Sequence, residues 1–189
     1  SEKVAAVDPA GRLLDAVQPL AYALELEVAP DAPGFSGRVR IDVQLTRAVD
    51  SVLLHARELR LDRVQIAPAG AAPITPAPPR AIGDSGLTAL DLPAPLGPGA
   101  ARIEIEFAGA YNAHLRSLYN TQAGGHAYAF TQFEPIYARQ AFPCFDEPRF
   151  KTPFELTLRV PQGLVAVANT RVAHQTDLAG GQTEFHFAR

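Results

Sequence analysis

The sequence predicts an all-β fold, an antiparallel β-sandwich. Apolar and polar residues alternate almost throughout, most clearly over 24–28 and 39–45, and a period of two is typical of strands with one buried and one wet face. No long segment has the 3.6-residue period of a helix. Many short strands separated by turn residues indicate a sandwich or barrel. The 189 residues are enough for a core that needs no disulfide or metal, and we expect a single domain over 1–189.

Ten segments carry the strand pattern. In chain order they are 24–28, 39–45, 52–54, 61–66, 87–92, 103–107, 127–131, 154–160, 164–168 and 183–187. Short helical turns are expected over 12–17 and 137–141. Residues 68–99 hold eight of the seventeen prolines, and proline lacks the N–H that a sheet interior needs. We expect a long Pro-rich surface connection there. The alternative, an interdomain linker, is less favoured because neither flank supplies enough strands for a closed sandwich.

The charge balance and composition exclude several classes of protein. Seventeen Lys and Arg against twenty Asp and Glu give a net charge of -3, unlike the basic surface of a nucleic-acid-binding protein. The apolar stretches are shorter than the ~20 residues of a membrane-spanning helix. The single cysteine, Cys144, excludes an internal disulfide. The lack of a disulfide favours a reducing compartment such as the cytoplasm. The lack of Met and the strand pattern that runs up to Arg189 suggest a fragment of a longer protein.

No self-contained catalytic or metal site is predicted. The sequence lacks His-Glu-x-x-His, a Gly-rich phosphate loop and a Gly-x-Ser-x-Gly elbow. His55 lies in an apolar strand pattern, so we interpret it as structural. Cys144, between Pro143 and Phe145, is interpreted as a small buried hydrophobic residue.

The segment 131–148 has an unusual composition. It reads TQFEPIYARQAFPCFDEP, with four aromatic residues and three prolines among charged and amide groups. We expect an ordered loop whose rings anchor it while a few polar side chains point outward, and such loops often carry binding residues.

This loop resembles the signature at the end of the N-terminal domain of the aminopeptidase N family of zinc metallopeptidases. The matching runs are Thr-Gln-Phe-Glu-Pro from Thr131, Ala-Arg from Ala138 and Ala-Phe-Pro-Cys-Phe-Asp-Glu-Pro from Ala141. Weaker resemblances lie at 19–24, 35–41, 53–56, 118–119 and 167–169. The resemblance implies a saddle-like β-sandwich packed on a C-terminal catalytic domain of the same polypeptide. That domain would carry the zinc and its His-Glu-x-x-His helix, so no cofactor and no catalytic residue are expected in this chain.

The resemblance also implies two substrate-binding residues. Glu134 would hold the free α-amino group of a peptide substrate, and Gln132 would line the pocket for its first side chain. A carboxylate selects an amine through a charge-assisted hydrogen bond of typically ~1.5–3 kcal/mol, and fixing the amine places the first peptide bond over the zinc. The alternative is a structural ion pair between Glu134 and Arg139. A cis Glu134–Pro135 bond is expected to aim both side chains to one side.

The remaining loop residues are expected to be structural. Arg139 would tie the loop to Asp146 or Glu147, and Phe133 would pack as a ring rather than touch substrate. Phe142 and Phe145 of the segment, and Phe150 just after it, would fill core or interface space.

The sequence supports two hypotheses for function. The first is the substrate-anchoring N-terminal domain of a zinc aminopeptidase that removes N-terminal amino acids from peptides, inactive by itself. The second is a non-catalytic β-sandwich binding or scaffold module, including a zinc-less relative of the family. The sequence beyond Arg189 would separate them through the presence or absence of a zinc helix.

Overall fold

The computed structural model describes residue 7 and residues 12–189, and these residues form an all-β architecture. The strands are β1 (Val17–Glu27), β2 (Gly34–Leu45), β3 (Val49–His55), β4 (Leu59–Pro68), β5 (Arg80–Ile82), β6 (Leu87–Leu96), β7 (Gly99–Ala110), β8 (Ser117–Ala123), β9 (His126–Gln132), β10 (Phe154–Pro161), β11 (Val172–Leu178) and β12 (Gln182–Phe187). One short 3-10 helix, η1 (Ala138–Gln140), follows β9. Within the described residues, no helix has the length and apolar character needed to cross a membrane.

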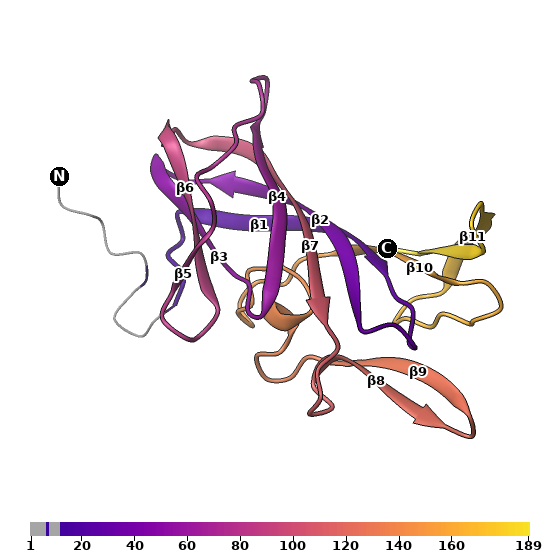
Figure 1. Cartoon of the computed structure of the whole chain (residues 1–189). Helices are drawn as coiled ribbons and strands as arrows, with labels where there is room; N and C mark the ends of the chain where they lie inside the picture. Colours follow the sequence, from indigo (N-terminus) through magenta and orange to yellow (C-terminus); the bar gives the residue numbers. More distant parts are fainter. Residues whose placement is uncertain (1–6, 8–11) are drawn as a thin grey trace.

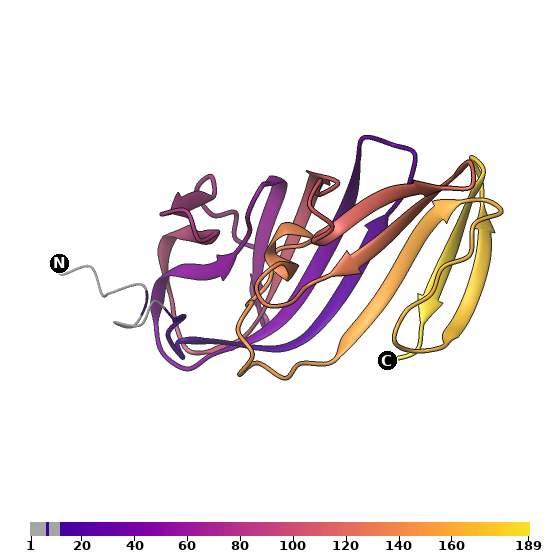
Figure 2. The same ribbon diagram turned by 90° about the horizontal axis from the view of Figure 1, so that it is seen from below.

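The strands form one large sheet and two small ones (Figures 1 and 2). The large sheet has the order β11-β12-β10-β1-β2-β7-β4, the second has β3-β6-β5, and β8 and β9 form a separate hairpin. All neighbours are antiparallel except β1 and β10, which pair in parallel with Tyr22 opposite Phe154. The expected purely antiparallel arrangement is therefore wrong, and the large sheet is mixed. Alternation predicts which face of a strand is buried, but it carries no information on the direction of the neighbouring strand.

The core lies between the large sheet and the β3-β6-β5 sheet. Val39, Ile41 and Val43 of β2 are fully buried beside Ile103 and Ile105 of β7. Val52, Leu54 and Leu90 from the smaller sheet belong to the same buried cluster. Each such side chain stabilises the fold by about 1.5–3 kcal/mol through burial, so these alternating residues account for the pairing of the two layers.

The other face of the large sheet carries cross-strand ion pairs. Arg38 contacts Glu25 at 2.9 Å, Arg159 contacts Glu184 at 2.6 Å, and the Nε of Arg102 lies 2.8 Å from Asp42. The arginine of each pair is exposed to solvent, and ion pairs that solvent reaches in this way contribute at most about 1 kcal/mol each. Their effect is to keep this face polar, in agreement with the predicted alternation.

Most of the expected strands are confirmed. Nine of the ten predicted segments overlap strands of the structure, and the 137–141 turn contains η1. The prediction of a strand over 164–168 is wrong, because these residues pair with no strand among the described residues. Residues 12–17 form a turn before β1 and no helix. Strands β5, β8 and β11 were not predicted.

The Pro-rich region is more structured than expected. It contains β5 and all of β6, and β6 pairs with both β3 and β5. Leu87 and Leu90 of β6 join the buried cluster, while Pro93 and Pro95 lie exposed near the end of this strand. The stretch is therefore part of the core layer as well as a surface connection.

Candidate functional site

The candidate site is the loop that leaves β9 at Gln132 and reaches β10 at Phe154. Its path turns at a cis peptide bond between Glu134 and Pro135, as predicted. The backbone N–H of Tyr137 then donates to the carbonyl of Phe133 at 2.8 Å, which closes the turn before η1. The segment predicted as an ordered loop therefore has a defined backbone path.

A buried arginine ties the two halves of the loop together. The side chain of Arg139 is 7% exposed, and its Nε donates to the Asp146 carboxylate at 2.7 Å. Its two terminal nitrogens donate to the carbonyls of Ser85, at 2.8 Å, and Asp146, at 3.1 Å. A guanidinium bound in this way by both charge and backbone is a strong local constraint. The predicted role of Arg139 is confirmed, with Asp146 as its partner.

His55 joins the loop to the β3-β6-β5 sheet. It exchanges two backbone hydrogen bonds with Cys144, at 2.8 and 3.0 Å, and its Nδ1 accepts the backbone N–H of Asp146 at 3.2 Å. Burial, together with the charge of Arg139, lowers the pKa of His55 from 6.5 to about 4. The imidazole is therefore neutral near neutral pH, as its acceptor role requires. This is the structural histidine expected from the sequence.

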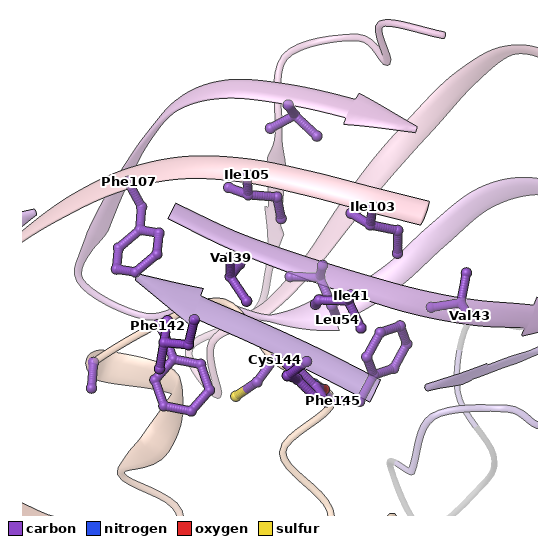
Figure 3. Packing of buried hydrophobic residues seen from close by; sticks show 14 of the residues in the cluster. Val39, Ile41, Val43, Leu54, Ile103, Ile105, Phe107, Phe142, Cys144 and Phe145 are labelled. Carbon is purple, nitrogen blue, oxygen red and sulfur yellow. The ribbon is translucent and has the colours of Figure 1, made fainter. Parts of the chain in front are cut away.

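Aromatic side chains hold the loop against the core. Phe142 packs edge-on against Phe133 and Phe154, with ring centroids 5.8 and 5.9 Å apart, and Tyr22 stacks on Phe154 at 4.4 Å. Figure 3 shows Phe142, Cys144 and Phe145 beneath β2, the strand that carries Val39 and Ile41. Burial raises the pKa of the Cys144 thiol well above its usual value, which fits a buried hydrophobic residue. Phe133 is a packed ring, as predicted.

Gln132 and Glu134 differ from the rest of the loop. Both side chains are exposed, and neither has a hydrogen bond or ion pair with any described residue. The alternative pairing of Glu134 with Arg139 is not formed, because the guanidinium is occupied by Asp146 and Ser85. The fold thus holds the backbone of these two residues and leaves a carboxylate and an amide free for other contacts.

An aromatic surface that was not predicted from the sequence adjoins Gln132. Phe130 and Tyr128 of β9 are 49% and 43% exposed, and the Phe130 ring lies 5.8 Å from that of Tyr119 on β8. Residues two apart on a strand share a face, as do directly opposed cross-strand residues. Because Ser117 pairs with Gln132 and Tyr119 with Phe130, these three rings lie on the face that carries Gln132. We call Tyr119, Tyr128 and Phe130 the hairpin aromatic face.

The sequence did contain a signal for this face. Residues 127–131 alternate alanines with aromatic rings, and the usual expectation is that the rings point inward. In the structure the smaller Ala129 packs on the core and the rings point outward. Figure 1 shows the β8–β9 hairpin as an element separate from the large sheet.

The described residues do not form a metal centre. No group of three or more His, Cys, Asp or Glu side chains within residue 7 and residues 12–189 is arranged to hold an ion.

Comparison with known proteins places the chain in a family. The model of the Peptidase M1 N-terminal domain matches residues 18–189. The chain is 34% identical over 173 residues to Aminopeptidase M1-C of Oryza sativa subsp. japonica, which covers 89% of this chain and 19% of that protein. It is 31% identical over 176 residues to the Puromycin-sensitive aminopeptidase of Caenorhabditis elegans, with 90% and 19% covered. Human Endoplasmic reticulum aminopeptidase 1 is 29% identical over 184 residues, with 93% and 20% covered.

These matches confirm the resemblance, and they show that it concerns only one part of the longer relatives. The chain spans about a fifth of the length of the curated relatives it matches. The match begins at Gln18, next to the first residue of β1, and runs to Arg189, so it takes in the whole sheet system and the loop with Gln132 and Glu134. The chain belongs to the family of Peptidase M1 N-terminal domains.

Proposed function

We propose that the chain is the substrate-anchoring N-terminal domain of a zinc-dependent aminopeptidase that removes N-terminal amino acids from peptides. The observation that carries the proposal is a pair of exposed side chains without partners among the described residues, Gln132 and Glu134, at the start of a loop that is otherwise fixed by buried contacts. The matching relatives bear the name aminopeptidase.

In this proposal Glu134 binds the free α-amino group of the substrate. The carboxylate accepts a hydrogen bond from the protonated amine, and such charge-assisted bonds are worth about 1.5–3 kcal/mol. Because Arg139 is held by Asp146, no described cation competes with the amine for Glu134. Fixing the amine fixes the position of the first peptide bond relative to the catalytic groups of the parent enzyme. Gln132 contributes an amide to the pocket for the first side chain.

The catalytic domain of the same polypeptide is the proposed partner of the hairpin aromatic face. A two-stranded hairpin is marginally stable alone in water, and exposed clusters of aromatic rings are typical of interaction surfaces. The β8–β9 pair has no third strand among the described residues. Packing of this face against the catalytic domain would bring Gln132 and Glu134 to the boundary between the two domains, where a substrate could be enclosed.

The test is a kinetic comparison in the full-length enzyme. Glu134→Gln keeps the shape of the side chain and removes its charge. We expect kcat/KM on substrates with a free N-terminus to fall about 10- to 150-fold, the equivalent of the lost bond, mainly through KM. The preference for free over acetylated N-termini should fall by the same factor.

The matched control is Glu155→Gln, an exposed carboxylate of β10 on the outer face. It should leave both quantities unchanged. Kinetics of Glu134→Gln equal to those of the control would refute the anchoring role, and a full-length protein without aminopeptidase activity would favour the binding or scaffold module.

A further inference from the structure

The connection between β10 and β11 carries the most exposed aliphatic side chains of the described chain. Val165 and Val167 are 84% and 83% exposed. The residues between and after them, Ala166 and Ala168, are partly buried and pack against the core cluster. The segment is therefore extended, with one apolar face on the protein and a second apolar face in solvent.

Apolar residues on both faces are typical of a strand that is covered on both sides. The sequence predicts a strand over 164–168, yet no strand forms there. Among the described residues, the N–H of Leu164 donates to Pro161 at 3.2 Å, and no other backbone hydrogen bond reaches 164–169. The backbone of this segment is thus free to pair.

The end of β12 lies beside this segment. The N–H of Ala188 donates to the carbonyl of Arg171 at 2.9 Å, and the hydroxyl of Thr170 donates to the carbonyl of Ala188 at 2.5 Å. These contacts place Arg189 next to Thr170, the residue after Asn169. Figure 2 shows the connection from β10 returning toward the C-terminus before β11 begins.

We propose that residues 165–169 form a strand in the full-length protein by pairing with the polypeptide beyond Arg189, which covers Val165 and Val167. This pairing rests on the proposed function only in that the polypeptide continues beyond this N-terminal domain. Because β12 runs antiparallel to the start of β11, the chain after Arg189 leads directly along 169–165. At about 3.3 Å per residue, the first ~5 to 10 residues beyond Arg189 are enough to lie along the whole segment.

This pairing would provide hydrogen-bond partners for the backbone of 165–169 and would cover its two exposed valines. The incoming strand supplies backbone donors and acceptors to the free edge of 165–169. Its inward side chains remove the two valines from water, in the manner of strand addition at an exposed edge. The same contact would join the N-terminal domain to the next part of the polypeptide.

Hydrogen exchange in the full-length protein tests the pairing. We expect the amides of 165–169 to exchange roughly 100-fold or more slowly than that of Gly70, in the exposed turn after β4, as hydrogen-bonded strands do. The exposed turn and the buried strand β2 provide internal references for open and closed amides. Exchange of 165–169 as fast as at the turn would overturn the proposal.

A substitution at Val167 tests whether the incoming strand covers the outward side chains. In the full-length protein, Val167→Asp should speed exchange over 165–169 by about tenfold or more, because a charge would be buried in the new contact. Leu115→Asp is the matched control, since Leu115 is 61% exposed and lies in another loop, and it should leave this exchange unchanged. Equal effects of the two variants would overturn the proposal.

Two further outcomes also decide the question. Protection that depends on protein concentration would identify a second copy of the chain as the occupant and overturn the intramolecular pairing. Aminopeptidase activity measured on the same protein separates the two proposals. An active enzyme with unprotected 165–169 refutes only the pairing, whereas protected amides in an inactive protein support the pairing and refute the proposed function.

Discussion

The neutral, buried His55 should make the stability of the chain dependent on pH. Burial and the charge of Arg139 lower its folded-state pKa from 6.5 to about 4, opposed in part by Asp146 and Glu147. Between these two values the unfolded chain binds the proton and the folded chain does not. The contribution of His55 to the free energy of unfolding is therefore fully present above about pH 6.5, and it is lost progressively as the pH falls toward 4. Between about pH 7 and pH 5 the loss amounts to about 2 kcal/mol.

His55→Asn is the variant that isolates this effect. The Asn side-chain oxygen can accept the Asp146 N–H as Nδ1 does at 3.2 Å, and it does not titrate in this range. We expect the free energy of unfolding of the variant to fall by about 2 kcal/mol less than that of the parent chain between about pH 7 and pH 5. This difference does not depend on how stable the variant is at neutral pH. Urea unfolding at several pH values measures the difference, and NMR of the ring protons reports the pKa directly.

Two results would refute this role of His55. An acid-side loss of the same size in His55→Asn would show that other groups cause it. A His55 ring that titrates near its ordinary value would show that the imidazole is not held neutral by the loop. Carboxylates that are stabilised by ion pairs, such as Glu184, whose pKa is lowered chiefly by Arg159, lose their contribution only at lower pH, so the window above about pH 5 is free of their effect.

Two further substitutions test the packing around the loop. Asp146→Ala leaves the buried guanidinium of Arg139 without its carboxylate. We expect the free energy of unfolding, measured with urea, to fall by about 3–5 kcal/mol. A decrease below about 1 kcal/mol would contradict a buried pair. Ser117→Gly should instead stabilise the chain by about 1–2 kcal/mol, because Ser117 has a φ of 57° and a buried hydroxyl without a partner in the described structure, and relief of both outweighs the added flexibility. Leu115→Gly is the control, with a φ of 57° but an exposed side chain, and should gain less; a less stable Ser117→Gly would refute the argument.

The strand positions depend on local chemistry, and for that reason they could be read from the sequence. Val39, Ile41 and Val43 alternate with polar residues because one face of β2 lies on the core. The same pattern is missing where a strand has no buried face of its own. Residues of β11 are almost all exposed, so the strand depends on hydrogen bonds to β12 and leaves no apolar pattern to detect.

The sequence indicates where the candidate site lies along the chain, but it does not indicate which contacts fix the loop in place. The composition of 131–148 indicated an anchored loop, and the structure agrees in the packing of Phe142 and Arg139. Which carboxylate Arg139 would choose was left open, because Asp146, Glu147 and Glu134 all lie within reach along the chain. The choice of Asp146 depends on Ser85 and His55, which the fold brings from distant positions.

Residue type and short-range periodicity were sufficient for the all-β class, most of the strands, the structural nature of His55 and Cys144, and the loop that carries Gln132 and Glu134. Three features required the folded chain, namely the parallel pairing of β1 with β10, the outward rings of the β8–β9 hairpin and the free edge at 165–169. Those features depend on which distant segments meet, and alternation along a strand specifies its buried face without specifying its neighbour.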